Sequence, residues 1–106
     1  MTINILGQDY DFQKIAAKDD MRMADIDGYC DGYGKTIRVN NDFNTNYPTN
    51  ISDLEAYKRQ VIRHEITHAF FEESGLEKYK GDELIVEWIA KQFPKMTKVF
   101  QQAGGL

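Results

Sequence analysis

The sequence predicts an α+β fold, in which a small antiparallel sheet of short strands from the N-terminal half packs on two helices from the C-terminal half. Three observations support this class. Segments with β propensity, separated by glycine-containing turns, fill the first 40 residues. Helical periodicity replaces them after residue 52. The chain has 106 residues and no visible repeat, which fits one hydrophobic core, so residues 1–106 are predicted to form a single domain.

Two β-hairpins are expected before residue 41. The segment TINIL, the turn residues Gly7 and Gln8, and the segment YDFQKI form the first. The segments RMADIDGYCD and KTIRVN, separated by the glycine-rich GYG, form the second. The asparagine-rich stretch over residues 41–50 contains Pro48 and is predicted to be a loop.

The first helix is expected to begin at Ser52 and to end at Gly75. Ser52 can serve as the N-cap, and Glu55 three residues later completes a capping box. Glycine is favoured just past the last helical turn because it adopts the left-handed conformation without strain. The periodicity of LEAYKRQVIRHEITHAFFEES predicts that one face packs on the core. That face comprises Ile62, Ile66, Ala69 and Phe70.

The second helix is expected to begin near Asp82, which can act as its N-cap. It carries the segment ELIVEWIAKQF, whose predicted buried stripe comprises Ile85, Val86, Ile89 and Phe93. Pro94 is expected to break or kink this helix, because proline lacks the backbone N–H and its ring clashes with the preceding turn. The segment KMTKVFQQ then continues as a final helical piece.

Composition and charge argue against several classes of protein. The chain has 17 acidic and 13 basic residues, and its densest basic cluster, Lys58, Arg59 and Arg63, lies beside acidic residues on a helix, so nucleic acid is not an expected partner. No apolar run approaches the length of a membrane span, and the first residues are too polar for a signal peptide. We therefore expect a cytoplasmic protein with no membrane partner. Cys30 is the only cysteine, which excludes an intrachain disulfide.

The segment VIRHEITHAF contains both histidines of the chain, His64 and His68, with Glu65 between them. Residues four apart on a helix lie one turn above the other, so two imidazoles can converge on one zinc ion. Glu65 points to a different side of the helix, where it can take a proton from a water molecule on the metal. The pattern His-Glu-x-x-His therefore predicts two zinc ligands and a general base.

A tetrahedral zinc site needs a third protein ligand, with water in the fourth position. Three of the five glutamates after the motif are poorly placed for this role. Glu72 is two turns from His64, Glu73 points away from the histidine row, and Glu77 lies in the connection between the helices.

The other two glutamates, Glu83 and Glu87, lie on the second helix, which can pack back against the first. Glu83 borders the buried stripe and is therefore the better candidate for the third ligand. Glu87, one turn later, could instead accept a hydrogen bond from a ligating imidazole and fix its orientation. Glu87 as the ligand and Glu87 as a solvated carboxylate both remain open.

The segments RHEITHAFFEESGL and DELIVEWIA resemble the small zincin-like metallopeptidases of bacteriophages and mobile elements, which are related to the ImmA/IrrE and gluzincin families. The second segment matches the motif that follows the His-Glu-x-x-His helix in that group at Asp82, Glu83, Val86, Ile89 and Ala90. Asp82 stands where the group often has asparagine. The short strands of the first half are similar to the hairpins that precede the helix in these proteins, although that pattern is less specific.

The resemblance implies a role for each matching residue. His64, His68 and Glu83 would be the zinc ligands, Glu65 the general base, and Glu87 a hydrogen-bonding partner of a ligand. Zinc-dependent hydrolysis of a peptide or protein substrate is then the expected activity. Two alternatives are a non-catalytic, zinc-stabilised module that binds a protein in a phage or mobile element, and a metal-free helical binding module.

The transition state of peptide hydrolysis carries an oxyanion, which a phenol or an imidazole can stabilise. No third histidine exists in the chain. The available phenols are Tyr33, Tyr47 and Tyr79, and nothing in the sequence selects among them.

Overall fold

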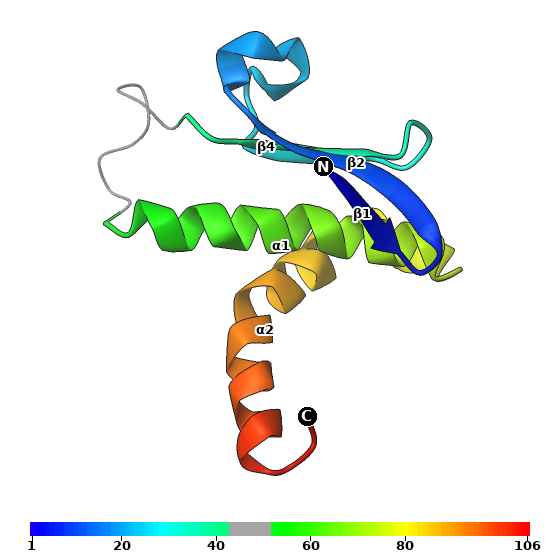
Figure 1. Ribbon diagram of the computed structural model, residues 1–106, viewed down its shortest axis with the longest axis vertical. Helices are drawn as coiled ribbons and strands as arrows, with labels where there is room; N and C mark the ends of the chain where they lie inside the picture. The colour runs from blue at the N-terminus through cyan, green and yellow to red at the C-terminus, as the bar shows by residue number, and fades with distance from the viewer. Residues whose placement is uncertain (43–51) are drawn as a thin grey trace.

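A computed structural model of the chain describes residues 1–42 and 52–106, so most of the predicted loop, with Tyr47, lies outside the described residues. The α+β class is confirmed. Figure 1 shows the sheet on one side of α1 and α2 on the other, with α2 projecting away from the body of the molecule. The elements are β1 (Thr2–Ile5), β2 (Gln8–Ile15), β3 (Gly28–Asp31), β4 (Thr36–Asn40), α1 (Leu54–Glu73) and α2 (Glu83–Gln102), with three short 3₁₀ turns.

The sheet is mixed, with the strand order β1-β2-β4-β3. Both predicted hairpins are present, and each is antiparallel. The expectation of a wholly antiparallel sheet is wrong, because β2 and β4 join the hairpins in parallel. These two central strands carry buried side chains that face α1, so their pairing collects the apolar surface of both hairpins in one place. The buried side chains are Tyr10, Phe12, Ile37 and Val39.

The strand predicted over residues 22–31 begins only at Gly28. The preceding residues form 3₁₀ turns at Ala17–Asp19 and Met21–Met23. The Asp20 side chain accepts a hydrogen bond from the backbone N–H of Arg22, and such a local bond competes with strand pairing. The edge strand β3 is consequently short.

The core lies between the sheet and α1 and includes the buried Val61 and Ala69 of that helix. Ile62 and Ile66 pack against it in part, as predicted. The prediction for Phe70 is wrong, since its side chain is 44% exposed. The centre of the buried face is the row Val61, Glu65 and Ala69. A hydropathy pattern treats a glutamate as an exposed residue. The predicted core face is therefore centred away from Glu65, toward Phe70.

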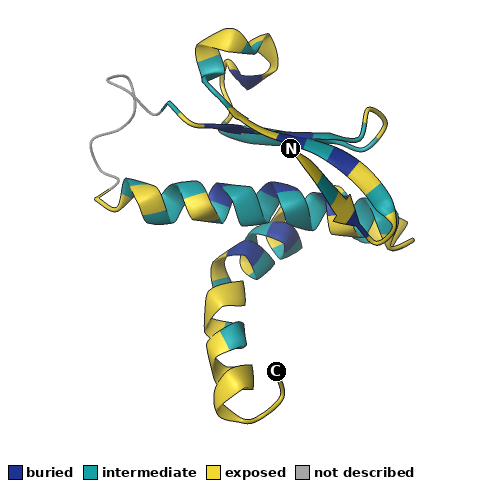
Figure 2. Ribbon diagram, viewed as in Figure 1, coloured by how far each residue is buried: buried dark blue, intermediate teal, exposed yellow. Residues whose placement is uncertain are grey.

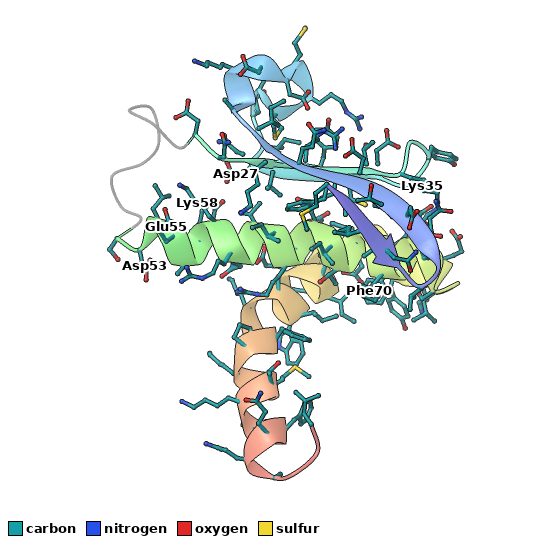
Figure 3. All side chains as sticks on the ribbon, viewed as in Figure 1. Asp27, Lys35, Asp53, Glu55, Lys58 and Phe70 are labelled. Carbon is teal, nitrogen blue, oxygen red and sulfur yellow. The ribbon has the colours of Figure 1, made fainter. Side chains whose placement is uncertain are left out.

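The N-cap of α1 is Asp53, whose side chain accepts a hydrogen bond from the backbone N–H of Ala56. The predicted capping box between Ser52 and Glu55 is therefore wrong. Glu55 instead pairs with Lys58 at 3.2 Å, and Figure 3 shows Asp53 and Glu55 together at the first turn of the helix. The predicted end of the helix is confirmed, because Gly75 adopts a φ of 82° directly after the Ser74 C-cap.

The N-cap of α2 is Asp82, as predicted, and its carboxylate accepts hydrogen bonds from the N–H groups of Leu84 and Ile85. Pro94 does not end the helix, which continues to Gln102. A proline leaves the carbonyl four residues earlier without its helical donor. That carbonyl belongs to Ala90, and Arg63 of α1 donates to it at 2.7 Å. Arg63 thus replaces the donor that Pro94 lacks, and this hydrogen bond connects the two helices.

The contact of α2 with α1 buries Val86 and Ala90 completely. The predicted stripe is wrong at Phe93, which is 54% exposed, because the helix has moved away from α1 by this position. Figure 2 shows that most of the projecting part of α2 is exposed. Within the described residues, neither long helix combines the length and apolarity that a membrane span requires.

One buried polar contact joins the sheet to the end of α1. Tyr10 is 1% exposed, and its phenol donates to Glu73 Oε2 at 2.6 Å, while Lys35 Nζ lies 2.7 Å from the same oxygen. The hydrogen bonds from Lys35 and Tyr10 hold the pKa of Glu73 below its ordinary value. Burial, with the carboxylate acceptor, raises the pKa of Tyr10.

Tyr10→Phe should lower the free energy of unfolding at pH 7 by about 1 kcal/mol, because a buried phenol loses its hydrogen bond. A carboxyl with a depressed pKa stabilises the fold above its unfolded-state pKa, about 4.3, and this stabilisation is lost as pH falls through the lower folded-state value. The difference in free energy of unfolding between wild type and Tyr10→Phe should therefore be smaller in acid. Urea unfolding at pH 7 and at pH 3 measures this difference. Tyr33→Phe, at a phenol that is 95% exposed, should leave the free energy of unfolding unchanged at both pH values.

Candidate metal centre

The middle of α1, the first turns of α2 and the edge strand β3 enclose a cleft of about 590 Å³. Gly28 and Cys30 line it from β3, and His64 and His68 from α1. The thiol of Cys30 is neutral at physiological pH, because burial raises its pKa to about 12. One wall of the cleft is thus a strand edge and the other is a helix face that carries both histidines.

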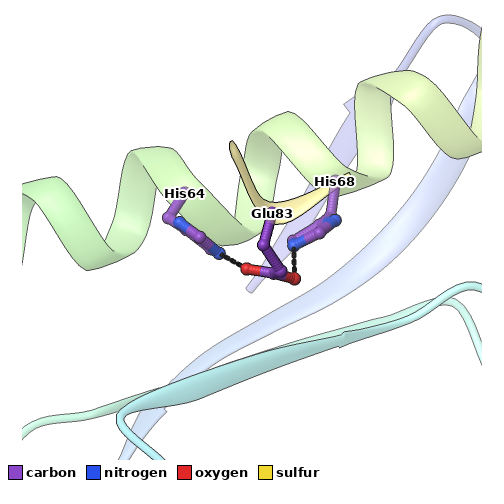
Figure 4. Close-up of side chains that lie close together, drawn as sticks. All are labelled: His64, His68 and Glu83. Carbon is purple, nitrogen blue, oxygen red and sulfur yellow. Dashed lines mark ion pairs between the residues drawn. The ribbon is translucent and has the colours of Figure 1, made fainter. Parts of the chain in front are cut away.

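His64, His68 and Glu83 come together in this cleft (Figure 4). The Nε2 atom of His64 lies 2.9 Å from one carboxylate oxygen of Glu83, and the Nε2 atom of His68 lies 2.8 Å from the other. One possible ligand atom from each side chain lies within 4.8 Å of the others. The ligand atoms of a tetrahedral zinc ion lie about 3.3 Å apart, given bond lengths near 2.0–2.1 Å. Small side-chain rotations would therefore suffice to enclose the ion.

The start of α2 determines where Glu83 lies. Asp82 caps the helix, so Glu83 is its first residue, and the buried Val86 and Ala90 hold the following turns against α1. The Glu83 side chain is 69% exposed, which leaves one side of the ligand group open to the cleft. Two imidazoles and one carboxylate with an open position are the ligand set of many catalytic zinc sites. The predicted ligands therefore fit the metal.

The second nitrogen of each imidazole also has a protein neighbour. The Nδ1 atom of His68 lies 2.7 Å from the carbonyl oxygen of Lys80. A carbonyl only accepts hydrogen bonds, so Nδ1 carries a proton, and Nε2, which faces Glu83, is the nitrogen available to a metal ion. This contact fixes both the tautomer and the orientation of His68.

His64 is supported by side chains instead. Its Nδ1 atom lies 3.0 Å from Glu87 Oε2, the position predicted for Glu87 as a partner of a ligand. This distance is within the range of an ion pair. The N–H of His64 is not aligned with the Glu87 oxygen, however, so the buried Nδ1 atom makes no hydrogen bond within the described residues. Gln60 donates to Glu87 Oε1 at 2.7 Å and orients the carboxylate.

Glu65, the predicted base, lies in the same cleft and is 7% exposed. Burial raises the pKa of Glu65 to about 7, His64 opposes this rise, and Glu83 and Glu87 add to it. Gly28 makes room for it, because a Cβ atom there would lie 3.1 Å from Glu65 Cγ and 2.9 Å from the carbonyl oxygen of Arg38. A carboxyl with a pKa near neutrality can both accept and release a proton.

The other glutamates near the motif are engaged elsewhere. Glu73 binds Tyr10, and Glu77 pairs with Lys80 at 2.9 Å. Glu72 lines the far end of the cleft, where a Cβ atom on Gly32 would lie 2.5 Å from its Cδ. None of the three joins the group of possible metal ligands, as the sequence predicted.

Of the three phenols considered from the sequence, the structure describes Tyr33 and Tyr79, and neither lines the cleft. Tyr33 is almost fully exposed at a hairpin tip, and the ring of Tyr79 lies 6.0 Å from that of Phe71. Among the described residues, the phenols that line the cleft are Tyr29 and Tyr57, which the sequence reasoning missed.

The sequence reasoning also missed Gln60, which binds Glu87. Its position one turn before His64 on the same helix could have indicated that it lies near the site. Lys80 contacts His68 through its backbone, which no residue pattern reveals.

Comparison of the chain with family models, curated proteins and solved structures finds no match. The resemblance to zincin-like peptidases therefore rests on the motif residues.

Zinc added to the metal-free protein should raise its thermal unfolding midpoint, because an ion that binds only the folded state stabilises it by mass action. At 100 times the dissociation constant the gain should be about 2.7 kcal/mol. Glu83→Gln should lose most of this gain, since an amide is a weaker zinc ligand than a carboxylate. Thermal unfolding with added zinc and with a chelator measures both proteins.

Glu77→Gln is the matched control, because it removes a carboxylate outside the ligand group and should keep the full response to zinc. A wild-type midpoint that responds to neither zinc nor chelator would contradict a metal centre at these residues.

Proposed function

We propose that the protein is a zinc-dependent peptidase that hydrolyses peptide bonds. The observation that supports this best is the position of Glu65, a buried carboxylate in the cleft that also holds His64, His68 and Glu83. A purely structural zinc site would have no need for a buried base beside an open ligand position.

His64, His68 and Glu83 would hold the ion. Bound zinc would supply a water of lowered pKa and polarise the scissile carbonyl. Glu65 takes the proton from the attacking water and later passes it to the leaving amine. The Lys80 carbonyl orients His68, and the carboxylate of Glu87 lies 3.0 Å from Nδ1 of His64.

The edge strand β3 offers a binding site for an extended peptide. The N–H of Asn40 donates to the carbonyl of Asp27, and antiparallel pairs alternate between bonded and non-bonded positions. Gly28 and Cys30 consequently turn their N–H and C=O groups toward the free edge, beside the cleft. A substrate peptide can pair with these groups as an added strand, which holds its backbone alongside Glu65.

Glu65→Gln should keep zinc bound but lower the rate of peptide hydrolysis by about 10²- to 10⁴-fold, because the amide cannot take a proton. Cleavage of a peptide library, with the metal content of each sample, measures both properties. Glu72→Gln, which removes a carboxylate at the far end of the same cleft, should retain activity. Full activity in Glu65→Gln would show that another group is the base.

A second candidate function is a non-catalytic, zinc-stabilised module that binds a protein. Both phenols that line the cleft favour it, because Tyr29 donates to Asp20 and Tyr57 donates to Asp27. Neither O–H is directed at an oxyanion in this arrangement.

A hydroxamate added to the cobalt-substituted protein distinguishes the two functions. A peptidase with an exchangeable ligand position should change its visible spectrum, whereas a closed structural site should not. An unchanged spectrum together with no cleavage would favour the binding module.

A further inference from the structure

The projecting part of α2 carries an apolar face that no described element covers (Figures 2 and 3). Trp88, Phe93, Val99 and Phe100 are each about half exposed, at 55%, 54%, 56% and 47%. A helix of a monomeric protein normally turns such a face toward its own core. Here Val86 and Ala90 of the first turns pack on α1, while the apolar side chains on the adjacent face stay half-buried or exposed along the helix.

The centre of this face has the spacing of a helix-pairing seam. Its positions are separated by four and three residues in alternation, which keeps them in one row along a helix that pairs with another helix. The seam comprises Ile85, Ile89, Gln92, Met96 and Val99. Pro94 falls on the opposite side of the helix, so its ring does not obstruct the seam.

The seam is nearly symmetric about Gln92. If two copies of α2 lie antiparallel about a twofold axis at this residue, Ile85 meets Val99 of the second copy, and Ile89 meets Met96. Gln92 then meets Gln92 of the second copy, and two amides can hydrogen-bond to each other. A single polar pair in an apolar seam specifies register and orientation.

The charged residues of α2 lie away from the seam. At 100° per residue, Glu83 and Glu87 fall beside Pro94 on the opposite side of the helix, and Lys91 and Lys98 also lie well outside the row. No charged side chain of α2 therefore interrupts the seam. The opposed dipoles of two antiparallel helices favour the proposed orientation.

We propose that the chain forms a homodimer through antiparallel pairing of its α2 helices, with Gln92 on the twofold axis. The contact is isologous and closes after two copies, because the same surface serves both partners. An anionic membrane is a less suitable occupant, since Gln92 interrupts the apolar face at its middle and the chain carries a net charge of −4. The dimer contact lies outside the metal ligands, so the proposal is independent of the proposed function.

Sedimentation velocity of the full chain over a range of concentrations tests the dimer. The wild type should change reversibly from monomer to dimer as concentration rises. Val99→Glu should raise the dissociation constant at least about tenfold, because it places a charge against Ile85 of the second copy at two symmetric positions. Gln101→Glu, which adds the same charge at a position away from the seam, should have a small effect.

Charge complementation at residue 92 tests the axis itself. Gln92→Lys and Gln92→Glu should each weaken the dimer, because like charges would meet across the axis. An equimolar mixture of the two variants should form a heterodimer, detectable by its mass in native mass spectrometry. Circular dichroism of each variant confirms that it is folded, and residue 92 is only half buried in the single chain.

Three results would overturn the proposal: a wild type that stays monomeric at every concentration, a dimer that none of the seam variants weakens, or a mixture that forms no heterodimer. Binding to phosphatidylglycerol vesicles without a dimer in solution would assign the face to an anionic lipid surface instead and would equally overturn it.

Discussion

The packing of α1 against the sheet is the constraint on which the candidate site depends. The row that faces the core contains Val61, Glu65 and Ala69, and the adjacent row carries both histidines. One helix therefore supplies core contacts and possible metal ligands from neighbouring faces. A buried carboxylate is costly unless its surroundings accommodate it. Gly28 on the edge strand leaves the space that Glu65 occupies, so the strand and the helix define the cleft together.

The second helix is attached to this unit over a short length. Val86 and Ala90 supply its buried contacts, while Gln60 and Arg63 of α1 bind it through side chains. Each polar contact lies in the first turns, near Glu83. The geometry of the possible metal ligands and the docking of α2 thus depend on the same small surface. Beyond it the helix projects from the body and leaves the apolar side chains of its later turns largely exposed.

Much of this arrangement followed from local sequence signals. The hairpins, Asp82 as an N-cap, Gly75 as a helix end and the meeting of His64 with His68 each depend on residues close in the chain. The parallel pairing of β2 with β4 depends on contacts between distant segments, and neither hairpin specifies which of its strands will be central. The exposure of Phe93 could not be predicted for the same reason, since the apolar stripe of α2 does not indicate how much of the helix packs against α1.

The two imidazoles differ in what holds them, and the difference bears on how the site can change over evolutionary time. His68 is oriented by the main chain at Lys80, so exchange of the side chain at residue 80 leaves that oxygen in place. His64 lies beside Glu87, which Gln60 orients, and a single nucleotide change can alter either of these side chains. Under the proposed zinc function, natural variation can therefore adjust metal affinity through the surroundings of one histidine, while the main chain conserves the orientation of the other.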